Sequence, residues 1–270
     1  MSEPGSQQEL LALACRLAVD AGTLAAEGRR LDVESGDTRA AMTAGTKSSR
    51  TDVVTRHDRA AEAAIVEGLQ NARPNDAIVG EEGANHTGTS GVSWFIDPID
   101  GTTNFLYGLP LWSTSVGAAD DEGPLVGAVY IPETNDLFAA GRGAGATRNG
   151  AEIVASGEVE LSLALVATGF GYTPERRRAQ AARLAEIAPL VRDLRRTGSA
   201  AIDLCYTAAG LVDAYFEENL NSWDMAAGEL IAREAGCRSG DFRGGAAHPA
   251  ELLVATPGVF DALQALLAPT

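Results

Sequence analysis

The sequence is poor in cysteine and has no long apolar run. Its three cysteines, Cys15, Cys205 and Cys237, stand far apart without a CxxC pair, which argues against a zinc knuckle or a disulfide framework and fits a reducing cytoplasm. The longest uncharged stretch, residues 101–119, contains asparagine, proline and small polar residues, so it is a poor membrane span. The first nine residues have neither a basic start nor an apolar run, unlike a secretory signal. We therefore expect a soluble cytoplasmic protein with no membrane association.

Positive charge is also scarce. The 270 residues include 21 Lys and Arg against 37 Asp and Glu, a formal net charge of -16, and Lys47 is the only lysine. Affinity for the phosphate backbone of DNA or RNA depends on clustered basic side chains, so we expect no direct nucleic-acid binding. Arginines cluster only at residues 176–178 and at Arg192, Arg195 and Arg196, and we interpret these clusters as solvated helix faces.

Two common catalytic motifs are missing as well. The sequence contains neither a GxSxG elbow nor a GxxxxGK[ST] loop, so acyl-serine chemistry and P-loop nucleotide hydrolysis have no support. His57, His86 and His248 have no metal-binding spacing among themselves, and we interpret each as an ordinary surface or core residue.

The composition that remains, with 45% hydrophobic and 21% charged residues, is typical of a globular α/β protein. We expect a single domain over residues 1–270, built from layered helices and sheets. The polar segment 32–51 indicates a mobile loop or an exposed hairpin. Helices are expected from a capping box at 6–9 to about 28, and at 56–72, 173–190, 199–210, 222–236 and 259–267. Strands, several joined by antiparallel turns, are expected at 77–80, 92–96, 112–119, 125–131, 137–140, 163–167, 214–217 and 252–256.

An acidic motif follows the expected strand 92–96. The strand delivers Asp97 at its end, Pro98 stiffens the turn, and Asp100 follows three residues later beside a glycine. Two carboxylates this close repel each other unless a cation lies between them, so the spacing indicates a metal. Backbone N–H groups of residues 101–103, at a potential helix start, offer a seat for a phosphate. The alternative is an Asp-rich turn that only caps a helix.

Five further acids stand at the ends of neighbouring elements. Each has an ordinary alternative: a surface loop after a strand, a helix-dipole contact, or a capping box. Oxygen ligands without a His or Cys cluster select a hard cation, with Mg²⁺ the first candidate and Mn²⁺ a substitute. Metal-assisted attack of water on a phosphate ester uses all these features together. The acids are Glu81 and Glu82 after the strand 77–80, Glu217 at the end of the strand 214–217, Asp224 in the first turn of a helix expected to be capped by Ser222, and Asp58 three residues after Thr55.

These motifs, in this order over about residues 10–265, resemble the inositol monophosphatase family, in particular its bacterial SuhB-type members. The string DPIDGTTNF is the most specific of them, and Trp223-Asp224 is a second signature. The resemblance implies the five-layer αβαβα sandwich of the inositol monophosphatase and fructose-1,6-bisphosphatase superfamily, usually as a homodimer. It also implies Mg²⁺-dependent, lithium-sensitive hydrolysis of a phosphate monoester. The matching segments are 52–58, 80–82, 94–105, 198–201, 213–217 and 223–224.

The resemblance also assigns roles, with the metal ligands in about residues 1–150 and the substrate side in about 151–270. Two or three Mg²⁺ ions per site are implied, with lithium replacing the second. The first would take Glu81, Asp97 and the carbonyl of Ile99; the second Asp97, Asp100 and Asp224; and Glu81 would hold a third through water. Glu81 and Thr102 would orient the attacking water, with Asp58 bonded to Thr102. Gly101 and Thr102 would seat the phosphate, Glu217 with Gly198, Ser199 and Ala200 would contact inositol hydroxyls, and Lys47 would sit on a mobile loop near the metals.

Substrate and cellular role have alternatives. Phosphatases for 3′-phosphoadenosine 5′-phosphate and histidinol phosphate resemble the chain too, but commonly carry lysine where Thr103 stands, which favours inositol 1-phosphate. Fructose 1,6-bisphosphate is an alternative substrate. The family's substrate-side serine is absent, with Gly169-Phe170-Gly171 in its place. A SuhB-like accessory role in the transcription machinery is the alternative from a different class.

Overall fold

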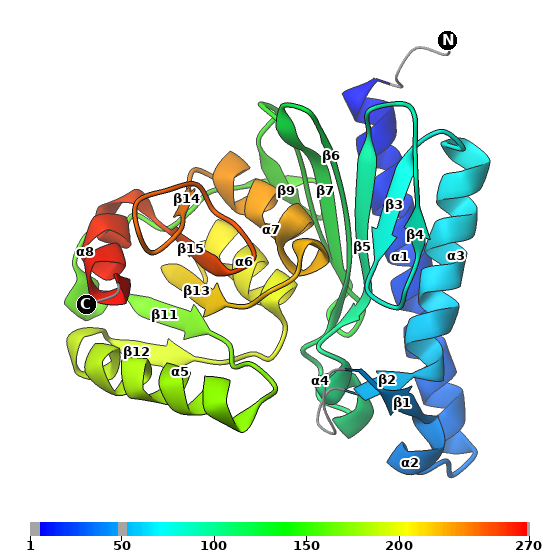
Figure 1. The fold of residues 1–270 in the computed structure, drawn as a ribbon, viewed down its shortest axis with the longest axis horizontal. Coiled ribbons are helices and arrows are strands. Elements are labelled where there is room, and N and C mark those ends of the chain that lie inside the picture. Colours follow the sequence, from blue (N-terminus) through cyan, green and yellow to red (C-terminus); the bar gives the residue numbers. More distant parts are fainter. Residues whose placement is uncertain (1–5, 48–52, 269–270) are drawn as a thin grey trace.

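The structure, a computed structural model, describes residues 6–47 and 53–268 and has five alternating layers of helices and sheets (Figure 1). Two helices cover the outer face of a large sheet, two more lie between this sheet and a smaller one, and two cover the far side of the smaller sheet (Figure 1). The αβαβα sandwich predicted from the sequence is confirmed.

The large sheet has eight strands, in the order β10-β9-β8-β7-β6-β5-β3-β4. Its strands are β3 (Ala77–Gly80), β4 (Asn85–His86), β5 (Ser93–Asp100), β6 (Ser113–Asp120), β7 (Gly123–Ile131), β8 (Asp136–Gly141), β9 (Ala146–Arg148) and β10 (Ala151–Ile153). β5 to β8 form the expected antiparallel run, whereas β3 and β5 are parallel. The sequence missed β4, β9 and β10 because each has only two or three residues, too few to show a period.

The smaller sheet has five strands, in the order β12-β11-β13-β15-β14. Its strands are β11 (Leu165–Thr168), β12 (Asp193–Arg195), β13 (Ala214–Glu218), β14 (Arg238–Gly240) and β15 (Glu251–Ala255). β11 is parallel to both neighbours, and β15 is antiparallel to β13. The short, polar β12 and β14 were not predicted.

The helices follow the expected order. They are α1 (Gln7–Glu34), α2 (Arg39–Met42), α3 (Arg56–Ala72), α4 (Thr102–Tyr107), α5 (Pro174–Ile187), α6 (Ala200–Ala208), α7 (Ser222–Glu234) and α8 (Pro257–Leu267), with single 3₁₀ turns at Leu161–Leu163 and Ala188–Leu190. The capping box of α1 between Ser6 and Glu9 is confirmed, but its expected end at Gly28 is wrong. A Cβ on Gly28 would lie 2.5 Å from the His57 ring, so this glycine admits close packing of α1 on α3 and does not end the helix.

The described part of the polar segment 32–51 contains elements that a loop prediction missed. It contains the end of α1, the short α2 and β1 (Thr43–Thr46), which pairs with β2 (Val53–Thr55). The hairpin alternative is therefore supported, although residues 48–52 lie outside the described part of the chain.

Among the described residues, three large apolar cores hold the layers together, and a fourth, smaller cluster contains Ile99, Phe105 and Trp112. One lies between α1, α3 and the large sheet, one around α6 and α7 between the sheets, and one between the smaller sheet and α8. Glycines allow α7 to lie directly on the large sheet: a Cβ on Gly127 would be 2.7 Å from the carbonyl oxygen of Ala227, and one on Gly117 would be 2.9 Å from its amide nitrogen. Among the described residues, no helix is both long and apolar enough to cross a membrane.

Candidate active site

A polar cavity of about 380 Å³ lies where the end of β5 meets the first turns of α6 and α7. It brings together residues from both sheets that are more than 100 positions apart in the sequence. Of the residues that the sequence analysis singled out for the site, all but Asp58 and Glu82 line it: Lys47, Glu81, Asp97, Ile99, Asp100, Gly101, Thr102, Gly198, Ser199, Ala200, Glu217 and Asp224.

A β-bulge at the end of β5 carries the two central acids. β5 pairs with β6 as far as Asp97, and pairing resumes at Asp100 two β6 residues further on, so β5 holds one extra residue between them. Side chains three positions apart on a regular strand face opposite sides. The bulge instead lets both carboxylates reach one cavity, and the amide of Ile99 donates to Asp97 Oδ1 at 3.1 Å within it. The expected end of the strand at Ile96 is wrong, since Pro98 needs no ladder hydrogen bond at a bulge.

Gly101 joins β5 to α4 in a left-handed conformation, with φ of 92°. A Cβ at this position would lie 3.1 Å from the carbonyl oxygen of Leu111 and 3.3 Å from that of Gly198. Both the positive φ and this close approach therefore favour glycine at position 101. The helix start predicted at residues 101–103 is confirmed. Its first N–H groups have no partner within the helix, and Gly101 and Thr102 both line the cavity.

Asp58 reaches the cavity indirectly, through Thr102. The Thr102 hydroxyl donates to Asp58 Oδ1 at 3.2 Å, while Asp58 Oδ2 accepts the Thr55 amide at 2.8 Å and forms the capping box of α3. Asp58 therefore caps α3 and also forms the predicted hydrogen bond with Thr102. Burial raises the pKa of Asp58 to about 6. Asp52, from the same motif, lies outside the described residues.

Two acids that line the cavity also hold the starts of helices. Asp100 accepts the Ser199 hydroxyl at 2.6 Å at the start of α6. Asp224 accepts the Asn221 amide at 2.5 Å and completes the capping box of α7. The predicted cap at Ser222 is therefore wrong: Asn221 is the N-cap, because the carboxylate three residues later bonds back to it.

Negative charge exceeds positive charge at this end of the cavity. Lys47 Nζ lies 2.9 Å from Glu81 Oε1 and also contacts the carboxylate of Glu82. Burial raises the pKa of Glu81 to about 7 against the attraction of Lys47. Burial and the neighbouring acids raise the pKa of Asp97 well above its usual range. This end of the cavity thus contains several buried carboxylates, the residue Ile99 with its backbone carbonyl, and one lysine. Such a set of oxygen ligands fits hard divalent cations such as Mg²⁺.

The other end of the cavity surrounds Glu217. Burial raises the pKa of Glu217 to about 7, and the Tyr215 hydroxyl donates to its Oε2 at 2.7 Å. A Cβ on Gly169 would lie 1.8 Å from that same oxygen, so the lack of a side chain at Gly169 makes room for Glu217.

Sequence reasoning missed three charged residues of the cavity wall. Asp203 is buried, its Oδ1 has no hydrogen-bond partner among the described residues, and burial raises its pKa well above the usual range. Its position one helical turn after Ser199 was the available signal, since residues four apart share a helix face. Arg176 and Arg196 also line the cavity, so the interpretation of their clusters as solvated faces is wrong for these two.

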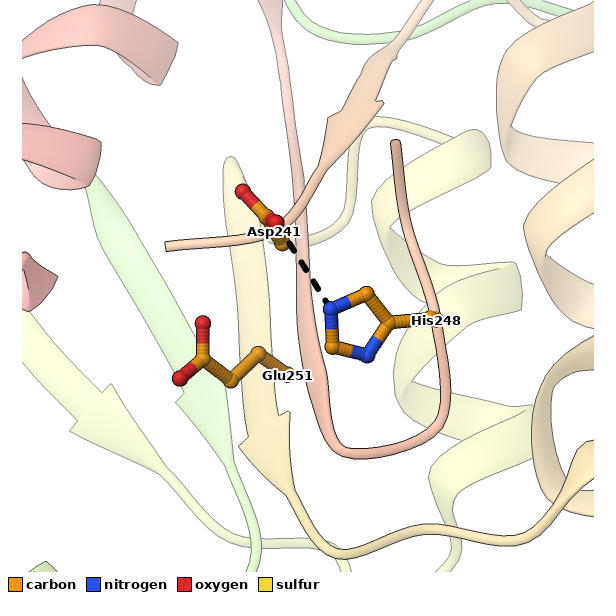
Figure 2. A group of neighbouring side chains, drawn as sticks. All are labelled: Asp241, His248 and Glu251. Carbon is orange, nitrogen blue, oxygen red and sulfur yellow. Dashed lines mark ion pairs between the residues drawn. The ribbon is translucent and has the colours of Figure 1, made fainter. Parts of the chain in front are cut away.

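A second group of charged side chains lies away from the cavity, after β14 (Figure 2). His248 Nε2 is 3.6 Å from Asp241 Oδ2, and Glu251 lies nearby. Asp241 Oδ1 accepts the amide of Gly245 at 2.6 Å, and Glu251 pairs with Arg243. Because both carboxylates already have partners within the chain, we interpret this group as stabilising the loop between β14 and β15.

Five layers around an acid-lined cavity define the class of this protein, the layered α/β phosphatases. The chain belongs to the inositol monophosphatase family, whose sequence profile matches residues 6–269, so the resemblance predicted from the motifs is confirmed.

Named relatives agree with this placement. Inositol-1-monophosphatase SuhB of Mycobacterium tuberculosis strain H37Rv is 42% identical, over 99% of this chain and 96% of its own length. The Nus factor SuhB of Pasteurella multocida is 40% identical, over 93% of this chain and 92% of its own length. The crystal structure of the extragenic suppressor protein SuhB of Bartonella henselae matches with a TM-score of 0.88 at 31% identity, covering 96% of this chain and 98% of that one.

Proposed function

We propose that this phosphatase is a Mg²⁺-dependent, lithium-sensitive enzyme that hydrolyses inositol 1-phosphate to inositol and phosphate. The observation that supports it most is the gathering of Glu81, Asp97, Asp100 and Asp224 in one cavity, beside the glycine-led start of α4. Carboxylates for divalent metals and backbone N–H groups for a phosphate are the two requirements of metal-assisted phosphomonoester hydrolysis.

The acids divide into two ligand sets that share Asp97. Glu81, Asp97 and the carbonyl of Ile99 would hold one ion, and Asp97, Asp100 and Asp224 a second, with a third held by Glu81 through water; Mn²⁺ would substitute and Li⁺ would inhibit. Bound divalent ions supply the positive charge that activates water and stabilises the leaving alkoxide.

Thr102 and Asp58 would position the attacking water. The Thr102 hydroxyl directs its proton to Asp58 Oδ1 or to the Ile99 carbonyl, at 3.2 and 3.1 Å. Its oxygen lone pairs then remain free to accept a hydrogen bond from water. Glu81, which lines the same cavity, would accept a hydrogen bond from the water molecule and so fix its orientation.

The opposite wall would hold the alcohol part of the substrate. Amides of Gly101 and Thr102 would receive the phosphate, while Glu217 and the turn at Gly198, Ser199 and Ala200 would meet the inositol hydroxyls. Glu217 already accepts one hydrogen bond from Tyr215, so a carboxylate oxygen remains for the substrate.

Phosphate release tests the proposal directly. Inositol 1-phosphate would be assayed with Mg²⁺ beside fructose 1,6-bisphosphate, 3′-phosphoadenosine 5′-phosphate and histidinol phosphate, each with and without lithium and with EDTA. Preference for inositol 1-phosphate, lost in EDTA and reduced by lithium, is the expected result. Preference for another ester would overturn the substrate but keep the metal chemistry.

A second candidate function is an accessory role in transcription, since several relatives are named Nus factor SuhB. The test is genetic: an Asp97→Asn variant that restores growth of a deletion strain as fully as the wild type would show that binding is the cellular function. The proposal also includes a cytoplasmic homodimer, which light scattering of the purified protein and cell fractionation would check.

A further inference from the structure

Glu62 is a buried acid that lies outside the predicted motifs and outside the cavity. It belongs to the face of α3 that packs on α1 and the large sheet, and only 6% of its surface is exposed. The neighbouring residues of this face, Ala61, Ile65 and Leu69, are part of the apolar core. A buried carboxylate costs free energy unless it is hydrogen-bonded, so an apolar side chain would be the ordinary occupant of this position.

Both carboxylate oxygens of Glu62 bind the turn at residues 81–84, which follows β3. Oε2 accepts the amide of Glu82 at 2.7 Å, and Oε1 accepts the amide of Ala84 at 2.9 Å. Gly80, the last residue of β3, leaves room for this contact, since a Cβ there would lie 2.4 Å from Oε2. Hydrogen bonds from an amide to a carboxylate are stronger than those to a neutral acceptor, so this contact holds the turn firmly.

The two bonds complete the hydrogen bonding of the turn. The amide of Glu81 donates to the carbonyl of Ile96 on β5 at 3.2 Å, and the amide of Gly83 donates to the carbonyl of Gly80 at 3.4 Å. All four amides of the turn therefore have an acceptor, and Glu62 accepts two of these four hydrogen bonds. The backbone that carries Glu81 is thus held by β5 before the turn and by Glu62 within it.

The same face of α3 also contacts the other group proposed to orient the attacking water. Asp58 lies four residues before Glu62, and residues four apart share a helix face. Asp58 accepts the hydroxyl of Thr102 at 3.2 Å. The start of α3 therefore carries two buried carboxylates, one bonded to Thr102 and the other to the turn of Glu81.

We propose that Glu62 is a positioning residue, which places the Glu81 carboxylate for metal and water by holding the backbone of the turn. This role rests on the phosphatase function proposed above, and Glu62 itself would touch neither metal nor substrate. Groups that hold metal ligands in place typically contribute about 10- to 100-fold to metal affinity or activity.

Two substitutions separate the position of the carboxylate from its charge. Glu62→Asp keeps the negative charge but withdraws the carboxylate by one methylene group, whereas Glu62→Gln keeps the length and loses the charge. Calorimetric titration with Mn²⁺ in the absence of substrate measures the metal affinity of each variant. We expect both substitutions to weaken Mn²⁺ binding at least about tenfold. Weaker binding in Glu62→Gln alone would mean that only the charge matters, and it would overturn the positioning role.

Glu67→Asp is the matched control, because it makes the same change at an exposed position of α3. This variant should bind Mn²⁺ as tightly as the wild type. A loss equal to that of Glu62→Asp would show that the substitution acts by weakening the helix, and it would overturn the proposal.

Kinetics and amide hydrogen exchange distinguish positioning from a general loss of structure. In Glu62→Asp, kcat should fall about tenfold or more while KM for inositol 1-phosphate changes little, since the substrate contacts are elsewhere. Exchange should become faster at residues 81–84 and stay unchanged in α6 and α7. Unchanged exchange in the turn, or faster exchange throughout the chain, would overturn the role. Glu62→Gln provides the same measurements if the shorter side chain prevents folding.

Metal binding also distinguishes this inference from the proposed function. A wild type that binds Mn²⁺ more tightly than Glu62→Asp, yet hydrolyses no phosphate ester, would support the role of Glu62 and overturn the phosphatase. Equal hydrolysis and equal Mn²⁺ affinity in the two proteins would keep the phosphatase and overturn the role of Glu62. A wild type that binds no Mn²⁺ would overturn both.

Discussion

Only one backbone amide of the described residues donates to the Asp97 carboxylate, and this makes it the most informative residue to change. Its Oδ1 accepts the amide of Ile99, a bond that the side-chain oxygen of asparagine can keep. Asp97→Asn therefore removes charge from both ligand sets while preserving the bulge. We expect phosphatase activity to fall at least ~1,000-fold, equivalent to about 4 kcal/mol of transition-state stabilisation.

Steady-state kinetics with saturating Mg²⁺ measure this loss, and circular dichroism with urea unfolding provides the control. Removing a buried charge from the metal-free fold should leave it as stable as the wild type or more so. Activity within tenfold of the wild type would exclude Asp97 as a ligand shared by two metals.

The ionisation of Glu217 should make the free energy of unfolding depend on pH. Burial raises its pKa from 4.5 to about 7, so the folded chain binds this proton more tightly than the unfolded chain does. Stability due to this group is therefore lost as the pH rises from about 4.5 to about 7 and stays lost above that range. Glutamine has no proton to lose and can still accept from Tyr215. We expect Glu217→Gln to raise the free energy of unfolding by about 3 kcal/mol at pH 8.

Urea unfolding in EDTA at pH 4.5 and pH 8 checks the sign. The variant should match the wild type at the lower pH and exceed it at the higher one. A difference that is the same at both values would mean that the substitution acts through packing and not through ionisation.

At the scale of elements, local signals in the sequence predicted most helices and strands. The span of α3 agrees with the prediction because Thr55 and Asp58 form a capping box at its start and Pro74 follows its end. The end of α1 was wrong because Gly28 reflects contact with another helix, which no local pattern reveals. The bulge in β5 was missed for the same reason, since it depends on pairing with β6.

Close packing of α7 on β7 gives a prediction at this scale. A methyl group on Gly127 would collide with the backbone of Ala227, so α7, which carries Asp224, must move. We expect Gly127→Ala to lower the free energy of unfolding by about 2 kcal/mol and to reduce kcat as well.

Gly157→Ala is the matched control, because Gly157 is exposed and a Cβ there has no atom within 4 Å. Its unfolding free energy should stay within about 0.5 kcal/mol of the wild type. If Gly127→Ala does the same, then α7 does not rest on the sheet as closely as described.

For the whole molecule, the cavity is a meeting point of the two sheets. Motif strings predicted the acids from each sheet, since each string is local. Asp203, Arg176 and Arg196 escaped prediction because only the packing of α5, α6 and the turn before α6 around the cavity brings them to it. Charge patterns along a sequence do not distinguish a solvated face from a cavity wall.

Metal binding should stabilise the folded chain, because the proposed ligands come together only when the chain is folded. A ligand at one hundred times its dissociation constant adds about 2.7 kcal/mol, which for a chain of this size raises Tm by roughly 5 °C. We expect Mg²⁺ at saturating concentration to produce such a shift relative to EDTA, measured by scanning calorimetry. Asp97→Asn should abolish most of it, and an identical shift in that variant would place the stabilising ions elsewhere.

Three of the site's acids, Asp58, Asp100 and Asp224, each hold the start of a helix as well as facing the proposed chemistry. A descendant of this chain that had lost hydrolysis would still need those carboxylates to fold, so drift would remove them slowly. Glu81, whose side chain contacts Lys47 and Asp97, does not hold the start of a helix. In comparing distant descendants, the survival of Glu81 would therefore report retained catalysis better than the survival of the three helix-bound aspartates.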